Sequence, residues 1–164
     1  MNFTSQVDVE IAPILRKIGN QTVADRMNDL LSDYNIINQN VKGFHWNFKG
    51  SDYFDFHQKF EDLHGKLQLD INKLAEQIAS IGYEPLHSYS DYLKNSIHKK
   101  VTGSNTNHVC LTNVIEGLRS LIFSSTLVAI EAEEVGENST EKLLRQFAFE
   151  LENELWVFTM LAKY

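Results

Sequence analysis

Two histidines and two glutamates in the first half of the chain are of the types that hold metal ions in proteins. His57 and Glu61 are four residues apart, His45 lies before them and Glu76 follows. Imidazole nitrogen and carboxylate oxygen together make a mixed ligand set that suits iron, zinc or manganese. The residue types therefore indicate a metal site, and their spacing decides how such a site could be built.

The segment that carries His57, Glu61 and Glu76 has the apolar periodicity of one long helix. At about 100° per residue, Glu61 lies about 40° from His57, Asn72 about 60° and Glu76 about 100°, so all four share one side of the helix. Yet Glu61 and Asn72 are about 16 Å apart along the axis at 1.5 Å per residue. One straight helix cannot bring both ends to the same metal ion.

Two copies of this helix, packed antiparallel across a twofold axis, would remove that distance. The His57 and Glu61 end of one copy would meet the Asn72 and Glu76 end of the other, and the symmetric interface would hold two equivalent sites. His45, at the end of the preceding helix, could close each site. The alternative is a solvated histidine–glutamate pair and a histidine at a helix end, and periodicity alone does not decide between these readings.

The elements that must position these residues are four amphipathic helices, predicted at about residues 21–47, 53–81, 109–134 and 138–163. Their apolar residues recur at three- and four-residue steps, which is typical of helices that bury one face. Short loops join the first pair and the last pair, and a longer connection with a short helix near residues 89–96 joins the pairs. The chain is therefore predicted to be all-α: one domain over residues 1–164, folded as a ferritin-like four-helix bundle.

Composition limits the partners and the compartment. The formal net charge of −7 disfavours general affinity for nucleic acid. Cys110 is the only cysteine, so no disulfide framework is expected, and its apolar surroundings predict a small buried hydrophobic side chain. The longest apolar run, at residues 121–130, is shorter than the roughly 20 residues of a membrane helix. The first residues do not resemble a secretory signal, so we expect a cytoplasmic protein with no membrane contact.

Several short motifs make a more specific pattern than the spacing alone. They are HWNFKG at 45–50, FDFH at 54–57, EDL at 61–63, LAE at 74–76 and ENELW at 152–156. From about Thr22 onward the chain resembles the Dps family, ferritin-like mini-ferritins named as DNA-binding proteins from starved cells. The resemblance implies a homo-oligomer, a hollow dodecamer built from twofold dimers. It implies a ferroxidase that oxidises Fe(II), preferentially with hydrogen peroxide, stores the ferric mineral and protects against oxidative stress.

The resemblance also assigns roles to the candidate ligands. His45, His57 and Glu61 would come from one subunit, with Glu61 in place of a more common aspartate. Glu76 would come from the other subunit as the main bridging or bidentate carboxylate. Iron is the implied metal, and zinc could substitute for it.

Two further positions, Trp46 and Asn72, lie beside these ligands. Trp46 would lie next to the centre, where it either donates an electron or packs at the dimer interface. Asn72 stands where the family usually has aspartate, and a neutral amide oxygen is a poorer ligand for a hard cation. We therefore expect one iron position to bind more weakly than it would with aspartate.

Two other functions remain open. Glu61 and His64 form a Glu-x-x-His pattern, which larger di-iron bundles use twice within one chain, so an intrachain di-iron site is one alternative. The other is a Dps-like shell with weakened ferroxidase chemistry that acts by iron sequestration or surface binding, and Asn72 favours it. His87, His98 and His108 are interpreted as surface histidines.

The resemblance further implies acidic pores at threefold axes. Glutamates gather around the turn between the last two helices, at positions 131, 133, 134, 137 and 141. We expect Glu134, Glu137 or Glu141 to line a pore, where carboxylates would concentrate Fe(II); a solvated acidic turn is the alternative. Because the first fifteen residues hold no lysine or arginine, tight DNA binding is not expected.

Overall fold

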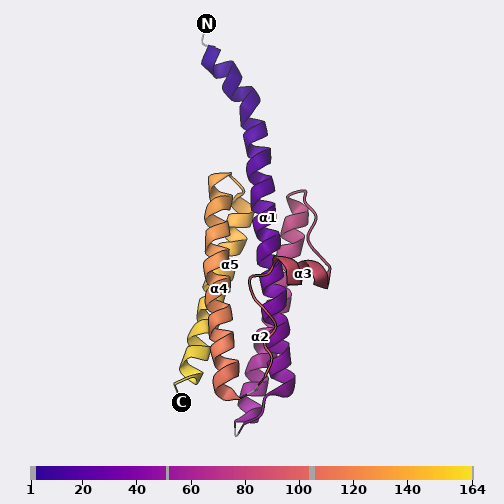
Figure 1. The fold of residues 1–164 in the computed structure, drawn as a ribbon. Coiled ribbons are helices and arrows are strands. Elements are labelled where there is room, and N and C mark those ends of the chain that lie inside the picture. Colours follow the sequence, from indigo (N-terminus) through magenta and orange to yellow (C-terminus); the bar gives the residue numbers. More distant parts are fainter. Residues whose placement is uncertain (1–2, 51, 104–105, 164) are drawn as a thin grey trace.

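The computed structural model describes residues 3–50, 52–103 and 106–163, with side chains described from Thr22 onward. The helices are α1 (Phe3–Asn47), α2 (Tyr53–Ser80), α3 (Tyr89–Asn95), α4 (Asn107–Glu134) and α5 (Asn138–Leu161), and this described part contains no strand. In Figure 1 the four long helices run side by side, and the short α3 forms part of the connection between α2 and α4. The predicted all-α class and ferritin-like bundle are confirmed.

The first helix is longer than its apolar pattern predicts. It begins at Phe3, whereas the predicted helix begins at about residue 21. Figure 1 shows the N-terminal part of α1 running well past the end of the bundle. Among the side chains that are described, the buried stripe of α1 runs from Val23 to Phe44. The other bounds of the long helices lie within two residues of the predicted ones.

The apolar stripes close the bundle core as their spacing predicts. On α1, Met27, Tyr34 and Val41 are almost completely buried, and on α2 the same holds for Phe60 and Leu67. α1 packs against α2 and α4 against α5, while α1 and α4 join the two pairs. Each large side chain buried in this way stabilises the fold by about 1.5–3 kcal/mol.

Three polar residues of α1 hold the long connection in place. The Asn28 side chain bonds to backbone groups of Glu84 and Leu86, before α3. After α3, the buried Asp33 carboxylate accepts hydrogen bonds from Ser96 and Ile97, and Asn40 bonds to backbone groups of residues 99 and 101. The connection therefore crosses the bundle as a fixed strap.

Glycine residues end two of the long helices. Gly82 and Gly136 have φ of 90° and 79°, the left-handed conformation in which glycine ends helices without strain.

Among the described helices, α4 alone is long and apolar enough to cross a membrane by length and composition. In the bundle, Leu118 and Leu121 of α4 are fully buried, so its apolar character matches its place in the core. Cys110 is buried there, as predicted, and burial raises the pKa of its thiol to about 11.

Candidate metal centre

The end of α1 and the start of α2 bring His45 and His57 together. The loop between the helices is short, and its Phe48 is 2% exposed because its ring packs 5.0 Å from that of Phe56 and 5.8 Å from that of Phe60. This aromatic cluster fixes the turn, so that the last turn of α1 faces the first turn of α2. The two imidazole rings stack with their centroids 4.0 Å apart.

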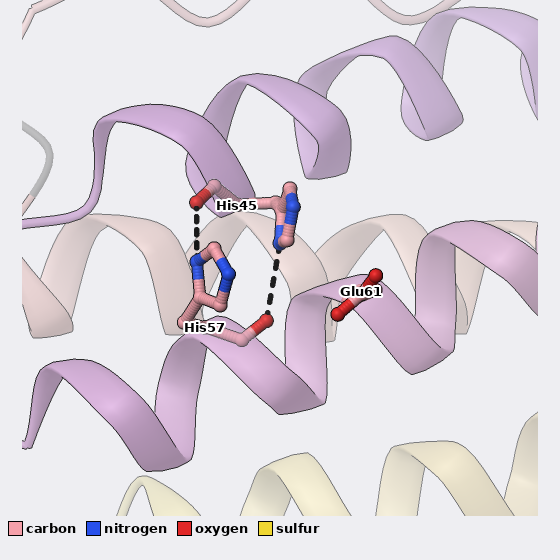
Figure 2. Close-up of side chains that lie close together, drawn as sticks. All are labelled: His45, His57 and Glu61. Atoms are coloured by element: carbon pink, nitrogen blue, oxygen red, sulfur yellow. Dashed lines mark hydrogen bonds between the residues drawn. The ribbon is translucent and has the colours of Figure 1, made fainter.

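Each histidine is held by the backbone of the other. The distance is 3.1 Å from His45 Nδ1 to the His57 carbonyl oxygen, and 3.1 Å from His57 Nδ1 to the His45 carbonyl oxygen. A carbonyl oxygen only accepts, so each Nδ1 must carry the hydrogen. In the neutral rings the lone pair then lies on Nε2, which is the arrangement of metal-binding histidines whose other nitrogen donates to a backbone carbonyl. Both dashed contacts are visible in Figure 2.

Glu61 completes a group of three candidate ligands. It lies one helical turn after His57, and Figure 2 shows its carboxylate beside the two rings. One ligand atom from each of the three residues lies within 4.8 Å of the others, with the histidines half-buried and Glu61 exposed. In the described part of the chain, His45, His57 and Glu61 are the only such group. They form an open half-shell of two nitrogens and one carboxylate.

Asn72 and Glu76 do not join this group within one chain. Both lie exposed farther along α2, and the Asn72 carboxamide oxygen accepts a hydrogen bond from Gln68 Nε2 at 3.4 Å. Trp46 is 61% exposed, with the Lys42 ammonium 5.3 Å from its ring centroid. The structure thus separates the candidate ligands into two sets at opposite ends of one helix face.

The bundle interior gives the intrachain alternative no support. His64 Nδ1 lies 2.8 Å from the Asn38 side-chain oxygen, so His64 donates there. Two carboxylates beside the interior, Asp70 and Glu150, are already paired, because Lys66 Nζ lies 2.7 Å from Asp70 and 2.9 Å from Glu150. Burial raises the pKa of Asp70 despite Lys66, whereas the hydrogen bond from Lys66 lowers the pKa of Glu150.

The acidic turn is partly neutralised by an arginine that sequence reasoning missed. Arg145 binds the carboxylates of Glu133 and Glu141, and its four-residue spacing from Glu141 is a pattern that could have indicated the pair. Glu134 is exposed at the end of α4, whereas Glu137 and Glu141 are half-buried; that one of the three lines a pore stays a prediction. Of the three histidines interpreted as surface residues, His87 and His108 are exposed. His98 is half-buried instead, and its Nε2 bonds to the Ser120 hydroxyl at 2.8 Å.

Comparisons with known proteins place this fold in a family. A ferritin-like domain model matches residues 24–163, nearly the whole bundle. The chain therefore belongs to the ferritin-like proteins.

Individual relatives indicate which family of ferritin-like proteins this chain is similar to. An uncharacterised protein of Haemophilus influenzae is 32% identical over 88% of this chain and 90% of its own length. The DNA protection during starvation protein of Brevibacillus brevis is 26% identical over 84% of this chain and 92% of its own. The crystal structure of a Dps protein from Vibrio cholerae matches with a TM-score of 0.85 and 31% identity, covering 88% of this chain and 91% of that one. Within the ferritin-like class, the chain belongs to the Dps family.

Proposed function

We propose that this protein stores and detoxifies iron, as a ferroxidase whose metal centre forms only between two copies of the chain. The observation that carries the proposal is the half-shell of His45, His57 and Glu61. The reciprocal backbone bonds occupy Nδ1 of both histidines, so that their Nε2 atoms are left for a metal. We expect its missing ligands to come from the same face of α2 in a second copy of the chain. Membership of the ferritin-like class and of the Dps family supports iron as the metal.

The sequence numbering of the candidate ligands supports one particular dimer. In an antiparallel pair of α2 helices, opposing His57 with Glu76 and opposing Glu61 with Asn72 both put the twofold axis at the same place, between Lys66 and Leu67. Gly65 lies just before that point and is exposed, with open space where its Cβ would be. A glycine inside a helix is destabilising by roughly 0.5–1 kcal/mol relative to alanine, and a close helix crossing would explain its presence.

Fe(II) is the substrate of the proposed centre. The two Nε2 atoms and the Glu61 carboxylate would bind it from one subunit, and Glu76 from the other. Two Fe(II) ions would supply the two electrons that cleave the O–O bond of hydrogen peroxide. With two water molecules, the products are two FeOOH units and four protons. Removing Fe(II) and peroxide together limits hydroxyl-radical formation, so the protein would protect against oxidative stress.

The ferric product would collect inside a hollow dodecamer in the cytoplasm. Several exposed apolar side chains support assembly beyond a dimer, since they lie on more than one helix: Leu69 on α2, Phe123 on α4, and Phe149 and Trp156 on α5. Contacts between subunits would remove these apolar side chains from water. The net charge of −7 suits a shell that attracts cations and does not hold DNA tightly.

Anaerobic addition of Fe(II), followed by peroxide, tests the proposal. Ferric absorbance should rise above the protein-free blank, on a particle of dodecamer size. His57→Ala should reduce the rate to the blank, whereas His87→Ala, which changes an exposed histidine outside the centre, should not. A small oligomer with no oxidation above the blank would contradict the proposed function.

Asn72 favours a second candidate, a shell with weakened ferroxidase chemistry that acts mainly by sequestration. This candidate predicts Fe(II) binding that His57→Ala abolishes, together with peroxide-driven oxidation close to the blank. The oxidation rate of the native protein therefore separates the two functions.

A further inference from the structure

A line of hydrogen-bonded side chains leads along the exposed face of α2 and ends at Asn72. His64 Nδ1 lies 2.8 Å from Asn38 Oδ1. Asn38 Nδ2 donates to Gln68 Oε1 at 3.4 Å, and Gln68 Nε2 donates to Asn72 Oδ1 at 3.4 Å. Three of the four residues lie on α2, and Asn38 of α1 joins His64 to Gln68.

The donors and acceptors of this line all run in one direction, from His64 to Asn38 in one step and from Asn38 through Gln68 to Asn72 in the next two. The Asn38 oxygen can only accept, so His64 Nδ1 carries a hydrogen in the neutral and in the charged ring. Each following amide then accepts on its oxygen and donates through its nitrogen, which is the arrangement that lets successive hydrogen bonds strengthen one another. Asn72 therefore holds its oxygen toward Gln68, and its Nδ2 hydrogens are left to donate elsewhere.

The proposed dimer decides where those hydrogens point, so this step rests on the proposed function. A twofold axis between Lys66 and Leu67 sets Asn72 opposite the partner's Glu61. A carboxylate accepts hydrogen bonds readily from an amide nitrogen. Flipping the Asn72 amide to offer its oxygen to a metal would instead put its nitrogen against the Gln68 nitrogen, donor against donor.

We propose that Asn72 is a positioning residue: its amide donates to the partner's Glu61 and leaves the centre with one tightly held divalent ion. The charge of the ligand set agrees with this number. The two carboxylates of Glu61 and Glu76 balance one divalent ion, and the histidines and Asn72 add no negative charge. A second ion would lack carboxylate ligands and would be held weakly.

Calorimetric titration of the iron-free oligomer with Zn(II) tests the stoichiometry without any oxidation step. The native protein should bind one tightly held ion per chain, and Asn72→Asp should bind two, because aspartate adds a carboxylate. Asn153→Asp is the matched control, since it adds the same charge at an exposed position of α5 and should leave one ion per chain. Asn72→Ala should keep one ion but bind it about tenfold more weakly, as expected for loss of a group that orients a ligand.

Two results would overturn the role of Asn72: two tightly held ions per chain in the native protein, or unchanged Zn(II) affinity in Asn72→Ala. Gln68→Ala adds an independent readout, because it releases the Asn72 amide and should weaken binding although residue 72 is unchanged. The proposed function fails in a different way. Zn(II) binding that survives in His57→Ala would show that the ions lie outside the centre, whatever their number.

Discussion

The half-buried Lys66, between α2 and α5, gives the sharpest stability prediction. Lys66 is the cationic partner of two carboxylates, at 2.7 Å from Asp70 and 2.9 Å from Glu150, and the Asp70 side chain is only 2% exposed. Lys66→Met keeps an unbranched, apolar stem that ends one atom earlier, and it removes the charge. Asp70 is then left as a buried carboxylate without its cation, a change that typically costs about 3–5 kcal/mol.

The expected loss lies near the lower end of this range, about 3 kcal/mol, because Lys66 is 18% exposed and water reaches its end of the pair. For a chain of this size, a loss of that magnitude lowers the melting temperature by roughly 6–12 °C. Differential scanning calorimetry of the native and variant proteins at equal concentration measures it. Lys142→Met, at an exposed position of α5, is the control and should change the melting temperature by a degree or two at most.

The pH dependence of this loss has a definite sign. Burial raises the pKa of Asp70 above its ordinary value, and Lys66 opposes that rise. In Lys66→Met the folded-state pKa of Asp70 therefore rises further above the unfolded one. A group of this kind costs stability as the pH rises through its folded pKa. The variant should be closest to the native protein at acidic pH and fall furthest behind at neutral pH.

Replacing Asp70 as well should restore stability. In Lys66→Met combined with Asp70→Leu, no buried charge is left on α2, and such replacements are often neutral or stabilising. The reasoning is refuted if Lys66→Met melts within about 2 °C of the native protein at pH 7, or if the double variant is less stable than the single one. Either result would mean that the ion pair contributes little and that Asp70 is not effectively buried.

Three further predictions address the interface, the thiol and DNA. Gly65→Leu should shift the oligomer toward monomer in size-exclusion chromatography while the helical circular dichroism is kept, and an unchanged elution would contradict a helix crossing at Gly65. Cys110 should not react with a thiol reagent at pH 8 until the protein unfolds, because burial raises its pKa to about 11; rapid labelling of the folded protein would show that it is accessible. DNA should not be retarded in a low-salt mobility-shift assay near neutral pH, and retardation at modest protein concentration would overturn that expectation.

The bundle was predictable because burial and helix geometry leave a periodic trace in the sequence. The stripe that includes Met27, Tyr34 and Val41 is buried as its three- and four-residue steps predict. The N-terminal extension of α1 was missed although Val7, Ile11, Ile14 and Ile18 recur at the same steps, and Pro13 within it is a residue that usually breaks a helix. Gly82 and Gly136 ended their helices as glycine at a left-handed position should.

The centre was less accessible to sequence reasoning. The spacing of His57 and Glu61 along one helix could be worked out, and so could their separation from Glu76. The reciprocal bonds between the backbone and the rings of His45 and His57 depend on how the turn between α1 and α2 packs, and no pattern predicts them. The same holds for Asn38, which joins the α2 amides from another helix.

Co-assembly of two defective variants tests most directly whether the centre is shared between subunits. His57→Ala and Glu76→Gln should each lack peroxide-driven Fe(II) oxidation, because every centre in either homodimer loses one ligand. In a mixed dimer, one centre combines the intact His57 with the intact Glu76, and the other centre lacks both.

Unfolding an equal mixture of the two variants and refolding it together should therefore restore about one quarter of the native oxidation rate, if the chains pair at random across the twofold axis. The two variants refolded separately and then mixed provide the baseline. Recovery well above that baseline is the result expected for a centre built from both subunits. A co-refolded mixture no more active than the separate variants, despite confirmed mixed dimers, would contradict it.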